Sequence, residues 1–212
     1  MSLSVEHVSK SFGDKLAVDD LSLSMERPGV FGLIGTNGAG KTTTIRMILG
    51  VADADAGTVR WKGGPLNRRT VRFGYMPEER GIYPKVTVID QLVYFAELRG
   101  LSRARAVEAA DGWLERLEMG EYRKMTAEKL SKGNQQKIQL IATVLHDPEL
   151  IFLDEPFSGL DPINAQVLKT LVTEMVAAGK LVIFCSHQMA SVEELCDDMP
   201  RLDFIPVVDV QV

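Results

Sequence analysis

A glycine-rich segment in the first quarter of the chain contains residue types that suit phosphate binding. It comprises Gly35, Thr36, Asn37, Gly38, Ala39, Gly40, Lys41, Thr42 and Thr43. Glycines let backbone N–H groups turn inward around a phosphate, a lysine can reach the β- and γ-phosphates, and a neighbouring hydroxyl can ligate Mg²⁺. The segment therefore predicts a nucleoside triphosphate site, with Lys41 as a catalytic cation and Thr42 as a metal ligand. Alone, it does not distinguish a kinase, a GTPase and a motor.

Two adjacent carboxylates, Asp154 and Glu155, follow the apolar segment 150–153. Ligands of a parallel sheet lie at the carboxyl ends of its strands, so this pair should emerge where the glycine-rich segment does. Neighbouring residues of a strand point to opposite faces, so we expect different roles for the two acids. Asp154 suits the outer shell of Mg²⁺, and Glu155 suits the general base for an attacking water. The alternative is an acidic helix cap near Pro156.

His187 follows a second apolar segment, at residues 181–184. A histidine at the carboxyl end of a strand can contact a γ-phosphate and orient water. A lone histidine can equally be an ordinary structural residue, and its position leaves both readings open.

The elements around these residues follow a strand–helix alternation. An apolar strand at 30–34 precedes the glycine-rich segment, and a helix at 41–49 follows it. Short strands are predicted between residues 3 and 25 and at 58–61, 72–75, 150–153 and 181–184. Helices are predicted at 87–98, 102–117, 131–146 and 161–179, several of them opening on a serine or aspartate cap. This order predicts an α/β fold with a parallel sheet and right-handed crossovers.

Further motifs give the chain a family resemblance. Leu130–Ser131–Lys132–Gly133–Asn134–Gln135–Gln136–Lys137 resembles the signature of ABC ATPases, Ser158–Gly159–Leu160–Asp161 resembles their D-loop, Ser186–His187 their switch histidine, and Phe12 their adenine-stacking aromatic. The motifs occur in the family's order over residues 4–196. The chain therefore resembles the ATP-binding subunit of an ABC transporter.

The resemblance implies a specific architecture. It consists of a P-loop NTPase core with a mostly parallel sheet, an N-terminal antiparallel β subdomain and an inserted α-helical subdomain. We expect one domain over residues 1–212, with the core and β subdomain at 1–76 and 148–196 and the helical subdomain at about 77–147. Residues 197–212 form an atypical tail containing two prolines, which suggests a truncated, frame-shifted or engineered end. We expect such an end to expose sheet edges.

The resemblance also implies how the site works. Phe12 would stack on adenine, and His187 would contact the γ-phosphate. Ser131 and Gly133 open a helix, which makes a second anion site. In the family this site and the D-loop, here with Asp161, close over the nucleotide bound by another copy. The implied working unit is a homodimer, or a pair of ATPase subunits, that uses ATP and Mg²⁺.

Glu78 departs from the family pattern. It stands where the family has the glutamine of the Q-loop, and an ionised carboxylate cannot donate hydrogen bonds. It can ligate Mg²⁺ or hold water, and we expect it to be a metal ligand. Lys132 and Asn134 also differ from the usual signature. These features resemble a subset of exporter ATPases, of the sodium or drug efflux type.

Integral membrane permease subunits are the implied partners. The exposed contact patch would comprise Ile82, Tyr83, Pro84 and Val86, although ordinary packing under the loop is an alternative. No apolar segment approaches the roughly 20 residues that span a bilayer. We therefore expect a cytoplasmic protein, peripheral on the inner face of the membrane through the permease, with reduced cysteines. The net charge of −5 argues against nucleic acid as a partner.

Three other functions are alternatives to transport. A soluble ABC ATPase acting on ribosomes or DNA is the main alternative, but such proteins usually carry two ATPase domains or a long coiled coil, and this chain of 212 residues has neither. The signature argues against a kinase or GTPase. Lys41, Asp154 and Glu155 argue against a binding module that no longer hydrolyses ATP.

Overall fold

The central layer of the protein is a parallel sheet. The computed structural model describes residues 2–67, 69–79, 81–187 and 202–206. The strands of this sheet are β3 (Gly29–Ile34), β6 (Phe73–Met76), β7 (Leu150–Asp154), β8 (Leu181–Ser186) and β9 (Leu202–Pro206). Their order is β6-β7-β8-β3-β9, and all the pairings are parallel. The carboxyl ends of the strands therefore share one edge of the sheet.

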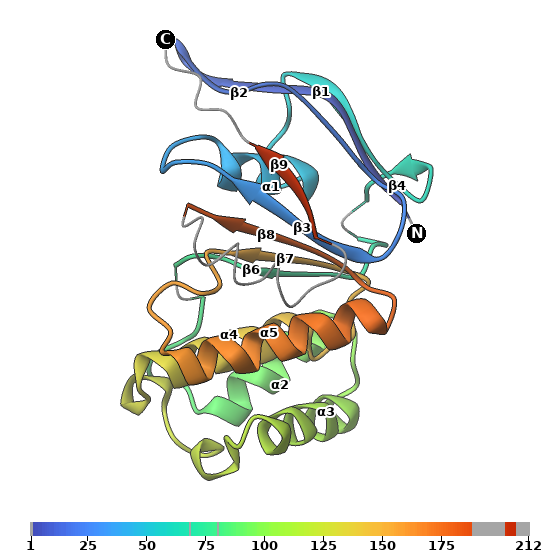
Figure 1. The fold of residues 1–212 in the computed structure, drawn as a ribbon. Helices are drawn as coiled ribbons and strands as arrows, with labels where there is room; N and C mark the ends of the chain where they lie inside the picture. Colours follow the sequence, from blue (N-terminus) through green and yellow to red (C-terminus); the bar gives the residue numbers. More distant parts are fainter. Residues whose placement is uncertain (1, 68, 80, 188–201, 207–212) are drawn as a thin grey trace.

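A second, antiparallel sheet lies over one face of the first (Figure 1). Its strands are β1 (Leu3–Phe12), β2 (Lys15–Met25), β4 (Ala56–Trp61) and β5 (Gly64–Pro65), in the order β2-β1-β4-β5. The short connection from Phe12 to Lys15 joins β1 and β2 into a hairpin. This hairpin extends towards the same edge as the glycine-rich segment.

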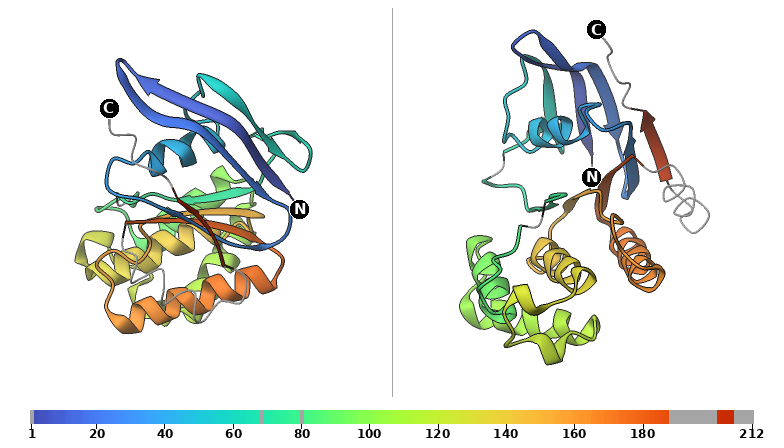
Figure 2. Two further views of the ribbon diagram at one scale, coloured as in Figure 1. Left: turned by 45° about the horizontal axis from the view of Figure 1, so that its top comes forward. Right: turned by 90° about the vertical axis from the view of Figure 1, so that its left-hand side faces the viewer.

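The helices divide between the two faces of the parallel sheet, as both views in Figure 2 show. They are α1 (Lys41–Ile48), α2 (Val88–Leu98), α3 (Arg103–Arg116), α4 (Lys132–Val144) and α5 (Pro162–Ala177), with short 3₁₀ turns at Gly120–Tyr122 and Ala127–Lys129. α1 lies between the two sheets, and the other four helices lie on the opposite face. Side-chain oxygens of Thr87, Ser102, Ser131 and Asp161 accept the N-cap hydrogen bonds that begin α2 to α5.

Strands β3, β7 and β8 are buried on both faces, and their side chains alternate between two apolar cores. Ile151 and Leu153 pack with α2 to α5, whereas Leu150 and Phe152 pack with α1 and the antiparallel sheet. In a continuous apolar strand, successive side chains point to opposite faces of the sheet, so both faces are apolar. This is typical of parallel strands that are covered on both sides. The α/β fold with parallel and antiparallel sheets is confirmed.

The sheet continues beyond the strands that the sequence predicts. Strand β9 pairs with β3 from Val30 opposite Leu202 to Ile34 opposite Pro206. Strand β9 covers the outer side of β3 and is itself the edge strand of the sheet among the described residues. Cys196 and the remaining tail residues, 197–201 and 207–212, lie outside the described residues.

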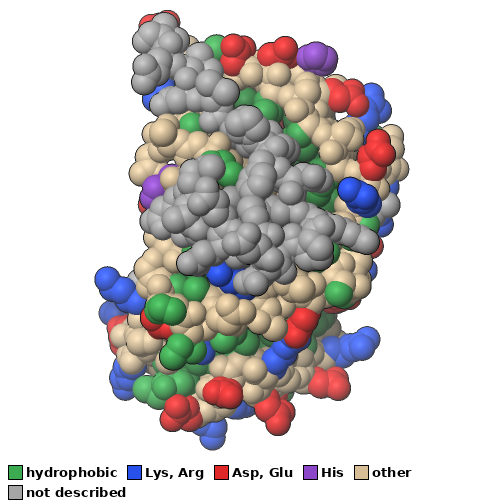
Figure 3. Space-filling model, viewed as in Figure 1, with side chains coloured by type: hydrophobic (Ala, Val, Ile, Leu, Met, Phe, Trp, Pro, Cys, Tyr) green, Lys and Arg blue, Asp and Glu red, His purple; other side chains and the backbone are tan. Residues whose placement is uncertain are grey.

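Two further features of the residues in the described ranges are the character of their helices and the distribution of surface charge. None of the helices in them is long and apolar enough to cross a membrane. On the face shown in Figure 3, acidic and basic side chains are interspersed over the helical end of the molecule.

Candidate nucleotide site

A cavity of about 470 Å³ opens at the carboxyl edge of the parallel sheet. It is lined by Phe12, Lys15, Ala17, Asn37, Gly38, Gly40, Lys41, Thr42, Thr43, Glu78, Asp154 and Glu155. The lining residues come from the β1–β2 hairpin, the glycine-rich segment, the segment after β6 and the end of β7. The tertiary structure therefore brings most of the residues selected from the sequence to one place.

Two glycines of the glycine-rich segment have left-handed backbone conformations, and one of them also allows a close approach to the hairpin. Gly38 and Gly40 have φ angles of 92° and 90°, a conformation that costs other residues free energy. A Cβ atom at Gly40 would lie 2.2 Å from the backbone oxygen of Ala17. Only glycine fits this position, where α1 begins beside β2.

Lys41 is the buried cation of the cavity. Its side chain is 7% exposed, and its Nζ donates to the backbone oxygens of Gly35 at 2.7 Å and Thr36 at 2.9 Å. The nearest oxygen of Glu155 is 4.0 Å away. The ammonium group therefore lies between the glycine-rich segment and the acidic end of β7. Ala39, in the same segment, is also buried.

Asp154 faces α1, as the alternation along β7 requires. The Thr42 hydroxyl donates to its Oδ2 at 2.8 Å, across 112 residues of sequence. Burial raises the pKa of Asp154, the hydrogen bond from Thr42 lowers it, and the negative charges of Glu78 and Glu155 raise it further. An electrostatic environment that penalises this carboxylate favours a cation at the same place.

Glu155 turns out of the strand direction. Its φ is 49°, in the left-handed region, which costs a residue with a Cβ atom about 1–3 kcal/mol. Its N–H donates to the backbone oxygen of Cys185 at 3.0 Å. Both carboxylates line one cavity beside the glycine-rich segment, where the pair was expected, but the premise that they lie on opposite faces of a strand is wrong, because the strand ends at Asp154.

His187 lies beside Glu155. Its Nδ1 is 2.7 Å from Oε1 of Glu155, and the hydroxyl of Ser186 lies 3.4 Å from Oε2. In the tautomer that carries a proton on Nδ1, His187 donates to Glu155. The two residues directly follow the adjacent strands β7 and β8, and they lie 32 positions apart in the sequence.

The donor atoms of the cavity fit Mg²⁺ bound together with a triphosphate. Magnesium takes one or two carboxylate or hydroxyl ligands and completes its shell with water and phosphate oxygens. Thr42 and Asp154 supply such a pair, and Glu78 supplies a further exposed carboxylate. No cluster of three or more histidine, cysteine or acidic side chains in the described ranges forms a metal site by itself.

The residues of the signature and the D-loop do not line this cavity. Ser131 caps α4 by accepting from the N–H of Asn134 at 3.2 Å. Asp161 caps α5, where Oδ1 accepts from the N–H of Asn164 at 2.9 Å. A Cβ atom at Gly133 would lie 2.9 Å from the amide nitrogen of the Asn164 side chain. Close packing of the two helix beginnings therefore also explains the glycine.

Phe12 lies at the rim of the cavity, with 57% of its surface exposed. Lys15 and Ala17, which the sequence reasoning missed, complete this side. The sequence could have indicated Lys15, because it is a basic residue three positions after Phe12, across a tight turn. The flat ring of Phe12 suits stacking on a planar base, and the ammonium group of Lys15 suits a phosphate.

The segment at 82–86 is only partly exposed. Ile82 is 8% exposed and packs in the helical core, so its selection as a contact residue is wrong. Tyr83, Pro84 and Val86 are exposed, and the sequence reasoning missed the exposed Tyr94 and Leu98 on α2. The ring of Tyr83 stacks on that of Phe95, with the centroids 5.8 Å apart.

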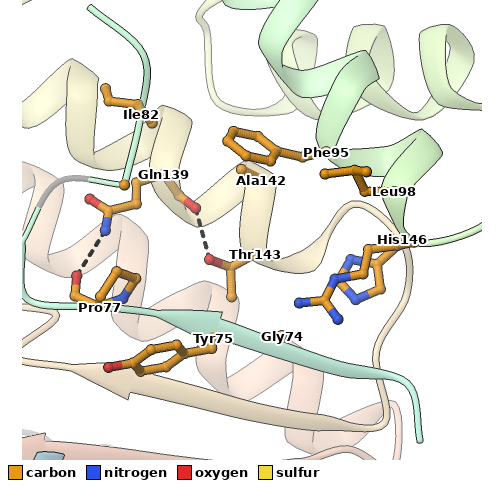
Figure 4. Close-up of a pocket in the computed structure, with 12 residues that line it drawn as sticks. Gly74, Tyr75, Pro77, Ile82, Phe95, Leu98, Gln139, Ala142, Thr143 and His146 are labelled. Carbon is orange, nitrogen blue, oxygen red and sulfur yellow. Dashed lines mark hydrogen bonds between the residues drawn. The ribbon is translucent and has the colours of Figure 1, made fainter. Parts of the chain in front are cut away.

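Tyr83, Tyr94 and Leu98 form an exposed surface. A cavity of about 300 Å³ lies beside it, between α2, α4 and β6 (Figure 4). Its lining residues are Gly74, Tyr75, Pro77, Gly81, Ile82, Phe95, Leu98, Arg99, Gln139, Ala142, Thr143 and His146. The exposed Leu98 belongs both to the surface and to the cavity wall, so the two are continuous.

The fold and the cavity define an ATP-binding domain of the P-loop class. The family described as ABC transporter matches residues 18–158, and the chain belongs to that family. YhaQ, an ABC transporter ATP-binding protein of Bacillus subtilis, is 52% identical over 198 residues, which are 93% of this chain and 66% of that protein.

Two further comparisons agree. Nod factor export ATP-binding protein I of Ralstonia nicotianae is 35% identical over 205 residues, which are 95% of this chain and 64% of that protein. A solved structure of an ATP-binding subunit of an ABC transporter superposes with a TM-score of 0.86 at 29% identity, over 100% of this chain and 88% of that one. The chain thus spans about two thirds of the length of these two curated relatives.

Proposed function

We propose that this chain binds ATP with Mg²⁺ and hydrolyses the ATP to drive transport across a membrane. The observation that carries the proposal is the convergence of Lys41, Thr42, Asp154 and Glu155 on one cavity beside a phosphate-binding loop. Backbone N–H groups at the start of α1 and the ammonium of Lys41 would hold the β- and γ-phosphates. Phe12 would stack on the adenine.

Glu155 is the proposed general base. It lies in a buried position within 4.0 Å of Lys41, and His187 fixes the direction of its carboxylate. A base must lie within reach of the water it deprotonates, and the wall of the cavity meets that need. His187 would also contact the γ-phosphate, because it borders the same carboxylate.

Thr42, Asp154 and Glu78 are the proposed metal-site residues. When bound, Mg²⁺ neutralises charge that develops on the phosphate oxygens. The Thr42 hydroxyl is already oriented by Asp154, so the pair presents a fixed donor set. Glu78 approaches from the segment after β6 and adds a second carboxylate.

The working unit is proposed to be a pair of chains, either two copies or two related ATPase subunits. Ser131, Gly133 and Asp161 stand at the beginnings of two packed helices, outside the cavity of their own chain. A helix beginning attracts anions, and an anion site that one copy does not use can close over a neighbour's nucleotide in a two-fold pair.

The proposed docking surface for membrane-spanning subunits comprises Tyr83, Tyr94 and Leu98, and Leu98 also forms part of the wall of the adjoining cavity. Neighbouring exposed aromatic and apolar side chains mark interaction sites. The chain would then act in the cytoplasm, peripheral on the inner face of the membrane. Export is the proposed direction, because one relative is named for the export of Nod factor.

A double variant, Tyr83→Asp with Leu98→Asp, tests the docking surface. Each change places a charge in an apolar contact, so binding to membranes that contain the partner subunit should weaken by at least about 30-fold. The measurement is co-sedimentation with those membranes, alongside phosphate release by the isolated chain, which should not change. Val51→Asp, at an apolar residue 59% exposed elsewhere, is the matched control. Equal co-sedimentation of both variants would reject the surface.

Replacement of Glu78 by glutamine tests the metal-site assignment. The maximal Mg²⁺-dependent rate, or the Mg²⁺ concentration at half that rate, should change by about 10-fold, as for other residues that support a metal. ATP affinity should change much less, because Lys41 and the glycine-rich segment are untouched. Glu79→Gln is the control, since Glu79 is also exposed but does not line the cavity. Identical kinetics of Glu78→Gln and wild type would make the acid incidental.

A further inference from the structure

Gln139 is a buried polar residue that the proposed chemistry does not use. It lies in the middle of α4 and is 5% exposed. Its Nε2 donates to the backbone oxygen of Pro77 at 2.8 Å and to that of Glu79 at 3.3 Å (Figure 4 draws the first of these). A buried amide with both protons used is a specific and directional contact.

The two acceptor oxygens belong to the residues on either side of Glu78. The Pro77 oxygen belongs to the peptide group directly before Glu78, and the Glu79 oxygen belongs to the peptide group one residue further on, so the two bonds anchor the backbone on both sides of Glu78. No other hydrogen bond to these two oxygens occurs within the described ranges. The segment that carries Glu78 into the nucleotide cavity is therefore held there by the side chain of Gln139.

α4 is a rigid frame for this contact. One turn after Gln139, the backbone of Thr143 packs so closely on β6 that a Cβ atom at Gly74 would lie 2.3 Å from the Thr143 oxygen. One turn before it, Gln136 donates to the backbone oxygen of Pro156 at 2.6 Å, next to Glu155. The helix that begins at Ser131 thus holds the backbone beside both carboxylates of the cavity.

We propose that Gln139 is a positioning residue, whose side-chain amide holds Glu78 in the nucleotide cavity and links it to the helix that carries the signature. The proposal rests on the proposed ATP hydrolysis, since Glu78 acts in that reaction. Gln139 does not touch the substrate; it acts through the backbone on both sides of Glu78. A shift of α4 relative to the sheet therefore moves this carboxylate.

The test compares Gln139→Met with Gln91→Met. Methionine keeps the approximate shape and removes both donors. Gln91 is 1% exposed and holds the far end of the same connection, accepting from the N–H of Tyr83 at 3.2 Å, so it controls for general loosening. Gln139→Met should reproduce the Mg²⁺-dependent change of Glu78→Gln, about 10-fold, with the KM for ATP within about 2-fold. Gln91→Met should not.

A double-mutant cycle gives the decisive result. Because Gln139 acts through Glu78, adding Gln139→Met to Glu78→Gln should produce little further change. Independent, multiplicative effects would overturn the proposal, and so would wild-type kinetics of Gln139→Met or of Glu78→Gln. Gln139→Asn, which keeps the donors but shortens their reach, replaces the methionine variant if that variant does not fold; it should show the same effect at smaller size.

Crystal structures of the variants separate this proposal from the proposed function. The Glu78 carboxylate should be displaced from the nucleotide cavity in Gln139→Met and keep its wild-type position in Gln91→Met. If the wild-type chain releases no phosphate from ATP, the proposed function fails, and the crystal structures still decide whether Gln139 holds the segment. A wild-type position of Glu78 in Gln139→Met would overturn the positioning role whatever the ATPase result.

Discussion

Replacement of Glu155 by glutamine should lower kcat for ATP hydrolysis by about 10²–10⁴-fold, the range that a positioned general base contributes. The amide has the shape of the carboxylate, and its oxygen can still accept from His187, so the geometry of the site is kept. What is lost is the ability to take a proton from water. The affinity for ATP should remain, because Lys41 and the glycine-rich segment are unchanged.

The same variant should accumulate as an ATP-bound pair of chains. If closed pairs separate only after hydrolysis, slowing the reaction lengthens their lifetime. Size-exclusion chromatography with ATP should therefore show a dimer for Glu155→Gln and a lower fraction for wild type. Glu115→Gln, at an exposed acid on α3, controls for the loss of one negative charge. Near wild-type turnover by Glu155→Gln would remove Glu155 as the base.

A mixture of two inactive variants should regain ATPase activity. Lys41→Ala removes the cation that holds the phosphates, and Ser131→Arg blocks the beginning of α4. Each variant alone should lose at least about 10²-fold in rate, as when one preorganised donor to a phosphate or oxyanion is removed. A mixed pair restores one complete site, from the loop of the Ser131 variant and the signature of the Lys41 variant.

An equal mixture should recover about a quarter of wild-type activity, since half of the pairs are mixed and each has one of two sites intact. Ser131→Arg also removes a helix cap, at a cost of about 0.5–2 kcal/mol, so thermal melting must confirm that it folds. Mixing Lys41→Ala with a chain that carries both changes is the control, because no pair then has a complete site. Equal rates in mixture and control would place the whole site in one chain.

Local chemistry made much of this site predictable. The glycine-rich segment, the acid pair after an apolar strand and the serine-capped helix each depend on residues that are neighbours in the sequence. A phosphate loop needs glycines, a lysine and a hydroxyl at fixed spacing, and those requirements are visible without a structure. The apolar segments of β3, β7 and β8 were equally clear, because strands buried on both faces show continuous hydrophobicity.

Burial within the connection after β6 was less predictable. Ile82 and Tyr83 are adjacent and apolar or aromatic, yet one packs in the helical core and the other is exposed. Residues outside regular elements have no fixed period, so their exposure depends on which neighbouring element they meet. The exposure of Tyr94 and Leu98 was not predicted, because apolar residues at helical spacing usually indicate the face of a helix that packs in the core.

The sequence by itself determined which residues can do the chemistry and that they stand on an α/β framework. The tertiary structure decided which of them meet: Thr42 with Asp154, Glu155 with His187, and Gln139 with the backbone beside Glu78. The physical reason is the strand order β6-β7-β8-β3-β9, which differs from the order along the chain. The strand ends meet at one edge of the sheet in that spatial order, and Glu155 turns into the cavity through its left-handed backbone conformation just after β7. The contact of Gln139 depends instead on the packing of α4 against β6.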